Sequence, residues 1–387
     1  MEATNKKFIE SKYCNYKGTQ QSFLLQQNQT SSCCRAYSEP LDTNKSITDY
    51  HLTWQHEKQQ LAQGVKLDGC KHCWESEDQG KISYRLTNTD KNTPIQIQLF
   101  LSNLCNHMCS YCSPKYSSLW EKSMQTHGIF QNISSSVTAN LKTTHSPTDT
   151  NYWLEQIQNY INTCDDHSVV LILLGGEPLM QQQNLKKLLN FNSKKIKNLM
   201  VQTNLNPPTN KFLIWILDNI PMDKLKIDIS IDASPDYNHI PRAGFDRTKF
   251  LSNLKLLQNN NVVFKFNSVV SVLAMFDFEN FIPWIHDNKF KVRFSKLNNP
   301  DCLNGYYVPF RFREKIWKKI NHLTLDPIVT ELLQHPDNTV DLKLLEQYNY
   351  LLQYFERSNI DPTTIDNEIF GEYWAWLAVH VKEKFRL

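Results

Sequence analysis

The chain has 387 residues, a formal net charge of +3 and 40% hydrophobic residues, enough for one large domain or a domain with a smaller module. Because no run of about eighteen apolar residues occurs and the N-terminus lacks the apolar core of a signal peptide, we expect a cytoplasmic protein without a membrane span. The near-balanced charge leaves nucleic-acid binding unsupported. In a reducing compartment, ten cysteines are more often metal ligands or reactive groups than disulfide partners.

Residues 1–92 are polar, and segments 24–32 and 57–64 indicate a loop and a short amphipathic helix. With so few apolar residues, we expect this region to need more than its own core, and small cores are often stabilised by a metal. Its thiols are sufficient for a tetrathiolate site, and the candidate ligands are Cys14, one or both of Cys33 and Cys34, Cys70 and Cys73.

From residue 93 onward, strand-like runs alternate with runs whose apolar residues have helical spacing. The predicted strands are 95–101, 169–174, 198–203, 225–231, 262–271 and 291–297. The predicted helices between them are 151–164, 185–192, 209–220, 246–260 and 276–288. This alternation predicts an α/β fold with a parallel sheet, either open and doubly wound or a partial (β/α)6 TIM-like barrel. In both, the active site lies at the C-terminal ends of the strands.

The rest of the chain is divided by composition. Residues 121–150 are rich in serine, threonine and asparagine, which indicates a long loop or lid insertion. Residues 303–387 are aromatic-rich and predict a helical C-terminal extension. We therefore expect a cysteine-rich module over 1–92, a core over 93–300 and an extension over 301–387. Two isolated cysteines are read as ordinary buried thiols, Cys164 and Cys302.

Three cysteines, Cys105, Cys109 and Cys112, lie on one loop directly after the first predicted strand. A structural zinc site uses four ligands, and a cubane iron–sulfur cluster usually takes four cysteines. His107 is the nearest fourth candidate, but it lies between two of the thiols and is poorly placed to reach the same metal. Three thiolates leave one metal position open, which is typical of a catalytic site.

This loop resembles the hallmark motif of radical S-adenosylmethionine (SAM) enzymes, Cys-x-x-x-Cys-x-aromatic-Cys, with Tyr111 as the aromatic residue. The resemblance implies a [4Fe–4S] cluster on the three cysteines, with SAM bound at the fourth iron. It implies that an electron from the cluster cleaves SAM to methionine and a 5′-deoxyadenosyl radical, which abstracts a hydrogen atom from the substrate. A reductant such as flavodoxin or ferredoxin is implied as a partner.

Further motifs follow successive strands in the order that the family shows. The segment Gly175, Gly176, Glu177 and Pro178 resembles the family's GGEP motif, in which the carboxylate would accept hydrogen bonds from the SAM ammonium group. After the next strand, Thr203 and Asn204 resemble the start of a TNG motif.

The later motifs depart from the family pattern at single positions, with Leu205 and Ala233 in place of glycines. Ser230 and Asp232 resemble the SIDG motif, and the resemblance places them at the SAM ribose. Asn267 is a further expected SAM contact, on the fifth strand. Three residues near the strand ends are candidates either for the substrate side or for packing: Tyr116, Trp120 and Arg242.

The five early cysteines resemble auxiliary-cluster modules called SPASM or twitch domains, although here the module precedes the core. The resemblance implies a second [4Fe–4S] cluster, with zinc and unliganded thiols as the alternatives. Relatives with such modules imply a peptide or protein side chain, or occasionally a sugar, as substrate.

Two other functions stay open. A radical SAM enzyme of modified-nucleobase synthesis, resembling 7-carboxy-7-deazaguanine synthase, would act on a small molecule and would not need the early cysteines. A catalytically inactive, metal-stabilised binding protein predicts decay of the SAM-contact residues.

Overall fold

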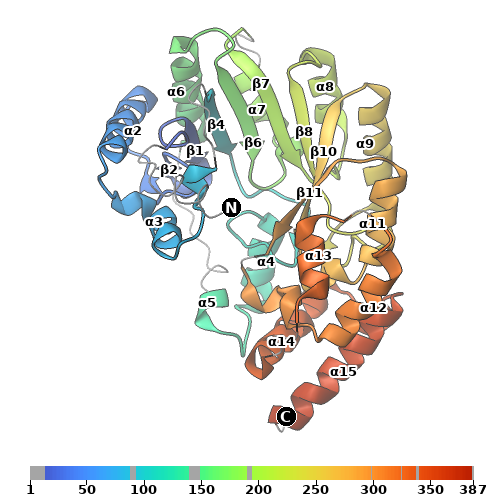
Figure 1. Ribbon diagram of the computed structural model, residues 1–387. Coiled ribbons are helices and arrows are strands. Elements are labelled where there is room, and N and C mark those ends of the chain that lie inside the picture. Colours follow the sequence, from blue (N-terminus) through green and yellow to red (C-terminus); the bar gives the residue numbers. More distant parts are fainter. Residues whose placement is uncertain are drawn as a thin grey trace. The chain divides into compact units, whose positions relative to one another are not determined.

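The computed structural model describes residues 14–87, 93–138, 149–189, 194–297, 299–323, 325–336 and 340–385 (Figure 1). The chain forms two compact units. The first unit comprises Met1–Ser102, Thr144–Val201 and Asp218–Lys226, and the second comprises Asn103–Thr143, Gln202–Leu217 and Ile227–Leu387. The early cysteine-rich segment therefore shares a unit with strands of the expected core, and the functional division at residue 92 stays a prediction.

The first unit is built on a mostly parallel sheet with the hydrogen-bonded order β7-β6-β4-β1-β2-β3. Its parallel strands are β1 (Gln20–Leu24), β4 (Ile95–Phe100), β6 (Val169–Leu174) and β7 (Ile196–Thr203). The antiparallel edge consists of β2 (Gln29–Ser31) and β3 (Glu39–Pro40). Because β1 pairs in parallel with β4, placing Phe23 opposite Leu99, the early segment extends the same sheet (Figure 1).

The early segment packs into the first unit through buried side chains of its own. Large side chains are fully buried there, among them Phe23, Tyr50 and Trp54. The predicted short helix is part of α2 (Ile47–Ala62), which begins with a capping box between Ser46 and Asp49. The segment does not need an independent core, because β1 joins a larger sheet. The remaining elements of the segment are η1 (Leu25–Gln27), η2 (Asp68–Cys70), α3 (Lys71–Asp78) and η3 (Tyr84–Leu86).

The helices of the first unit follow the predicted alternation. They include α6 (Thr150–Thr163) and α7 (Gln182–Leu189), with the short η5 (Pro178–Met180) between β6 and α7. Helix α6 buries Trp153, Ile157 and Ile161, one residue per turn on the same face. This spacing is the reason that the sequence pattern identified the helix.

The second unit contains the strands β8 (Leu225–Ser230), β10 (Val263–Val270) and β11 (Val292–Lys296), in the order β11-β10-β8. Strands β10 and β11 are parallel. A separate two-stranded ribbon pairs β5 (Met108–Cys109) with β9 (Arg242–Ala243). The helices between these strands are α8 (Lys211–Asn219), α9 (Arg247–Asn259), α10 (Val272–Met275) and α11 (Phe278–Asp287).

Residues after β11 are mainly helical, as predicted. They form η6 (Asp301–Leu303), η7 (Gly305–Tyr307), α12 (Phe310–Ile320), α13 (Pro327–Gln334), α14 (Asp341–Ser358), η8 (Pro362–Thr364) and α15 (Glu368–Phe385). The fully buried Arg313 donates to the backbone oxygens of Val308 and Leu332, which ties α12 to the end of α13. In the described residues, every helix is too short or too polar to cross a membrane.

The prediction of a long loop over 121–150 is wrong in its first part. Helix α4 (Ser118–His127) covers that stretch, and the short α5 (Ser135–Thr138) follows. The Ser117 side chain caps α4 by accepting from the Trp120 backbone N–H, and Trp120 and Met124 are buried one turn apart. Residues 139–148 of the predicted insertion lie outside the described residues.

Candidate functional site

The three-cysteine loop of the second unit is anchored by its own short strand. Strand β5 pairs with β9 so that Cys109 lies directly opposite Arg242. Cys109 is buried, whereas Cys105 and Cys112 are half-buried. The Cys105 sulfur accepts a hydrogen bond from the His107 backbone N–H at 3.4 Å. The pairing fixes the central thiol and leaves the two flanking thiols nearer the surface.

Side chains from α4 and α14 hold the backbone of this loop. The Trp120 Nε1–H donates to the Cys109 carbonyl at 2.9 Å, and the Tyr350 hydroxyl donates to the Ser110 carbonyl at 2.7 Å. The Tyr354 hydroxyl contacts the carbonyls of Met108 and Ile240 at 3.2 and 2.9 Å. Sequence reasoning missed both tyrosines, although their spacing of one helical turn on a buried face of α14 was the available signal.

Replacing Tyr354 with phenylalanine is expected to destabilise the second unit by about 1–3 kcal/mol, because the carbonyls of Met108 and Ile240 lose the buried donor that they share. The Ala243 backbone N–H, which donates to the same hydroxyl at 3.3 Å, loses its acceptor. Urea unfolding followed by circular dichroism measures the change. Tyr348→Phe on the same helix is the matched control, because Tyr348 is only half-buried and packs its ring against Trp374. Equal effects of the two variants would show that the hydroxyl contacts contribute nothing.

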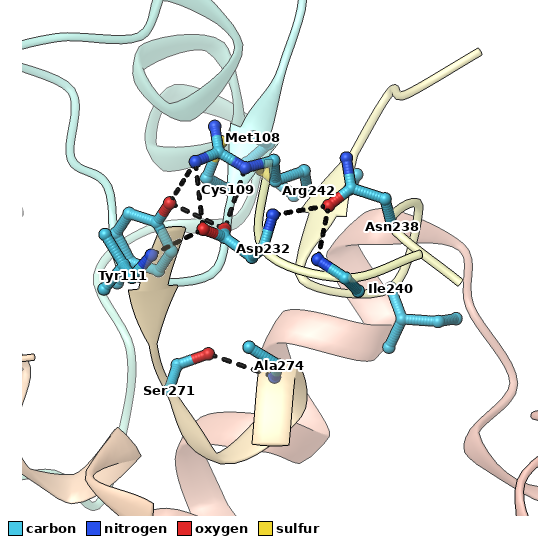
Figure 2. Close-up of polar contacts among 12 residues, drawn as sticks. Met108, Cys109, Tyr111, Asp232, Asn238, Ile240, Arg242, Ser271 and Ala274 are labelled. Carbon is cyan, nitrogen blue, oxygen red and sulfur yellow. Dashed lines mark hydrogen bonds and ion pairs between the residues drawn. The ribbon is translucent and has the colours of Figure 1, made fainter. Parts of the chain in front are cut away.

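A buried ion pair lies behind the central cysteine (Figure 2). The Arg242 guanidinium donates to both carboxylate oxygens of Asp232, from Nε at 2.8 Å and from Nη2 at 3.2 Å. The Tyr111 hydroxyl accepts from Arg242 Nη2 at 2.5 Å and donates to Asp232 at 2.7 Å. The Val269 backbone N–H supplies a further donor to Asp232 at 2.8 Å. We refer to Asp232, Arg242 and Tyr111 as the buried triad.

In the buried triad, Asp232 and Arg242 bind each other, whereas the sequence predicted a SAM contact for Asp232 and a substrate or packing role for Arg242. The Asp232 side chain is 0% exposed and both of its oxygens already accept two hydrogen bonds. Its predicted contact with the SAM ribose stays a prediction. Arg242, a candidate for the substrate side, directs Nη1 to the Cys109 sulfur at 3.6 Å. The arrangement aims a fixed positive charge at the central thiol.

Burial makes Cys109 and Cys112 weak acids while they carry no metal. It raises the pKa of Cys109, although neighbouring Arg242 acts in the opposite direction. Burial, together with Cys109 nearby, raises the pKa of Cys112 to about 12. Both thiols are therefore protonated at neutral pH, and a metal centre that binds them must displace their protons.

His107 is used for packing. Its side chain is 1% exposed, Nε2 contacts the Asn206 side-chain oxygen at 3.4 Å, and the ring packs against Phe245. Burial and nearby Arg242 lower the pKa of His107 to about 3, so the imidazole is neutral. The expectation that His107 does not complete the metal site stays a prediction.

The TNG-like segment keeps the backbone shape of glycine despite its leucine. Leu205 has φ of 55°, in the left-handed region that favours glycine, and is fully buried. The Asn204 side chain donates to the Asn106 side-chain oxygen at 3.0 Å, next to Cys105. Of the other predicted contacts in this unit, Ser230 and Asn267 are half-buried, and the Asn267 carbonyl accepts from the Ile231 N–H at 3.1 Å.

The GGEP-like segment belongs to the first unit and has the backbone that its glycines suggest. Gly175 and Gly176 have φ of 73° and 43°. A Cβ on Gly175 would lie 2.7 Å from a ring carbon of Phe100, so any side chain there would clash with the end of β4. The Glu177 carboxylate is buried and accepts from the Leu179 N–H at 2.9 Å, at the start of η5 that Pro178 begins.

A cavity of about 310 Å³ adjoins the third cysteine in the second unit. Its wall includes Cys112, Tyr111, Tyr116 and Tyr350. Tyr116 was a candidate for substrate contact or packing, and it lines this space. Trp120, the other aromatic candidate, is fully buried and belongs to the support of the loop.

In the first unit, four of the five early cysteines line one small cavity of about 20 Å³. They are Cys14, Cys33, Cys70 and Cys73, whereas Cys34 is exposed. Three separate segments supply these four thiols, so their convergence is a product of the fold. Among the described residues, no three His, Cys, Asp or Glu side chains are spaced to hold a single metal ion. A cubane cluster spreads its thiolates over four iron atoms, which requires wider spacing than one ion does.

Basic side chains surround this four-thiol cavity. Lys17 and Arg85 line it, and each is paired with a glutamate, Glu57 at 2.6 Å and Glu77 at 2.6 Å. Burial raises the pKa of Cys70 to about 11, while Lys17 acts in the opposite direction. Buried cations favour thiolates, but glutamates neutralise both of these, and a cavity of about 20 Å³ holds little more than one water molecule. An iron–sulfur group on these thiols stays a prediction.

Comparison with known proteins gives a family for the central part of the chain. The model of the radical SAM superfamily matches residues 99–283. A curated relative, the radical SAM cyclopropyl synthase TigE of Paramaledivibacter caminithermalis, is 27% identical over 184 residues, which cover 45% of this chain and 35% of that protein. This chain therefore spans about a third of the length of that relative.

Solved structures give weaker likenesses. The structure of native anSMEcpe with bound AdoMet has a TM-score of 0.40 and 17% identity, and the match covers 59% of each chain. Streptococcus suis SuiB bound to its precursor peptide SuiA has a TM-score of 0.36 and 12% identity, with coverage of 82% of this chain and 60% of that chain.

Proposed function

Since this chain is an enzyme of the radical SAM superfamily, we propose that it cleaves SAM reductively and uses the 5′-deoxyadenosyl radical to abstract a hydrogen atom from a peptide or protein side chain. The observation that carries the proposal is the loop with Cys105, Cys109 and Cys112, whose central residue is paired with β9 and faces Arg242. Three thiols on a firmly held loop fit a [4Fe–4S] cluster with one open iron.

The [4Fe–4S] cluster, when bound, supplies the electron that cleaves SAM. The chain's own residues would hold the cluster in place and set its reduction potential. Arg242 donates to the Cys109 sulfur, and such hydrogen bonds and charges raise the reduction potential of a thiolate-bound centre. Tyr350 and Tyr354 keep the loop backbone in place, and burial of Cys109 excludes water from that thiolate. Glu177 would accept hydrogen bonds from the SAM ammonium group.

We also propose a second, auxiliary cluster on Cys14, Cys33, Cys70 and Cys73, because the fold brings these four thiols to one cavity. Four protein thiolates would close the coordination of such a cluster, which favours electron relay over direct substrate binding. The modified-nucleobase alternative has no use for these thiols, so their convergence favours the SPASM- or twitch-like function and a peptide substrate. The inactive-protein alternative is disfavoured because Glu177, Asn204, Ser230 and Asp232 are all present.

Anaerobic incubation of the reconstituted protein with SAM and dithionite is expected to yield 5′-deoxyadenosine, and an added substrate peptide is expected to increase the yield. With a peptide deuterated at its side chains, mass spectrometry should find deuterium in the 5′-deoxyadenosine. Loss of two hydrogen atoms from the peptide would indicate ring formation, the type of product that the name of the curated relative describes. Deuterium transfer from nucleobase precursors and not from peptides would contradict the proposed substrate class.

A further inference from the structure

A cavity of about 790 Å³ lies in the second unit, away from the cysteine-loop residues in sequence. Residues 234–251, helix α11 and the turn between α14 and α15 form its wall. Its volume falls within the range of ligand sites and exceeds what one small ion needs. The three loop cysteines and the segments 175–178, 203–205 and 230–233 do not contribute to it.

The wall of this cavity is acidic. Its charged residues are four aspartates, Asp236, Asp277, Asp361 and Asp366, and one arginine, Arg247. Arg247 is already paired with Asp236 at 2.6 Å, so negative charge remains in excess. A concave acidic wall attracts cations and disfavours phosphates and carboxylates.

A buried hydroxyl in the wall points to a bound ligand. Tyr237 is 7% exposed, and among the described residues its hydroxyl has no hydrogen-bond partner. A buried polar group without a hydrogen-bond partner lowers the free energy of unfolding by about 1–3 kcal/mol. The carboxylate of neighbouring Asp277 is directed elsewhere: it accepts from the Ser234 N–H at 2.6 Å and from the Asn280 side chain at 2.8 Å. Because Tyr237 lines the cavity, a small shift of its side chain would let a bound ligand supply the missing partner.

The rest of the wall is apolar and aromatic. It includes the half-buried Trp284 and the aliphatic residues Ile240, Leu251, Ile360 and Ile365. Lysine and arginine side chains combine an apolar stem with a cationic end, and such cations are attracted to aromatic faces. Aliphatic and aromatic surface beside carboxylates therefore matches these two side chains better than it matches a hydrated metal ion.

We propose that this cavity binds a basic segment of the peptide substrate, with a lysine or arginine side chain held among the aspartates and against Trp284. The inference rests on the proposed function, in which the substrate is a peptide. It adds a recognition site and a charge requirement to that substrate class.

The position of the cavity in the chain connects it to the candidate active site. The wall residues 234–240 lie between two members of the buried triad, Asp232 and Arg242. Within this segment, the Asn238 side-chain oxygen accepts from the N–H groups of Asp232 and Ala233 at 3.0 and 3.2 Å (Figure 2). A peptide bound at the cavity would therefore contact the same chain segment that positions Arg242 against Cys109.

Fluorescence anisotropy tests the proposal, with a labelled lysine-containing peptide, the full chain under anaerobic conditions and no SAM. Lysine acetylation of the peptide is expected to weaken binding at least about tenfold, equivalent to about 1.4 kcal/mol. The protein variant Asp236→Asn/Asp366→Asn should weaken binding to a similar extent, because it removes two carboxylates and leaves Arg247 unpaired. Asp223→Asn, an exposed aspartate of the first unit, is the control and should leave affinity unchanged.

Tyr237→Phe separates a binding role from a folding role. It is expected to weaken peptide binding about threefold to tenfold while leaving the thermal midpoint unchanged or higher, since the free protein loses an unpaired hydroxyl. Equal affinity for native and acetylated peptides would overturn the proposal, as would equal affinity for free lysine amide. Peptide binding without hydrogen abstraction would refute the proposed function alone, and 5′-deoxyadenosine formation from a peptide that does not bind here would refute this inference alone.

Discussion

Replacing Cys105, Cys109 and Cys112 together with alanine is expected to lower the iron content of the anaerobically reconstituted protein from roughly eight to about four atoms per chain, since each cubane cluster holds four irons. SAM cleavage should be abolished, because no iron with an open position remains. Iron and acid-labile sulfide assays measure the first effect, and chromatography of 5′-deoxyadenosine measures the second. The remaining irons should be those held by the four-thiol cavity.

The complementary variant replaces Cys14, Cys33, Cys70 and Cys73 with alanine and should retain the other cluster. Cys34→Ala is the matched control, since Cys34 is exposed and does not line the cavity. It should keep the full iron content. A triple variant without any iron would show that the early cysteines hold no cluster, and a wild-type protein without iron would refute the site at the cysteine loop.

Replacing Asp232 with alanine is expected to destabilise the second unit by about 3–5 kcal/mol, because it leaves the buried Arg242 charge without a counter-ion. Arg242 is 7% exposed and donates two of its hydrogen bonds to this carboxylate, so water cannot substitute for Asp232. Urea unfolding of the metal-free protein gives the change in free energy. The same variant should bind iron less tightly at the cysteine loop, since Arg242 is no longer held against Cys109.

The double variant Asp232→Ala/Arg242→Met separates the buried charge from the loss of packing. It should recover a large part of the lost stability, because neither charge is left buried alone. Asp236→Ala is the surface control: its partner Arg247 is 55% exposed, and such pairs contribute about 0–1 kcal/mol. A double variant as unstable as Asp232→Ala would mean that side-chain volume, and not charge, decides the effect.

The strands of the core could be predicted from two apolar patterns, a continuous run over 169–174 and an alternating one over 225–231. The first predicted strand coincides with β6, and the second differs from β8 only at its last residue. Continuous runs are typical of strands buried on both faces. The role of β1 could not be predicted, because "QQSFL" is short and polar and becomes a strand through its pairing with β4.

Some features of the candidate site could likewise be predicted from the sequence, and others could not. The motif of three cysteines and the glycines at Gly175 and Gly176 depend on short sequence spacing, so they were visible in the sequence. The buried triad brings Tyr111 next to Asp232, a separation of 121 residues, which only the tertiary fold provides. The convergence of four early thiols, and the exclusion of Cys34 from them, likewise needed the structure.

The hydrogen bonds from α14 to the cysteine loop have a consequence for biosynthesis. Tyr350 and Tyr354 follow their partners in the loop by 240 and 246 positions. At about 5–20 residues per second, the ribosome completes the loop roughly ten to fifty seconds before it makes these tyrosines. The nascent loop thus emerges with its thiols and carbonyls unsupported. The interval before α14 docks is the period in which oxidants can reach those cysteines most easily.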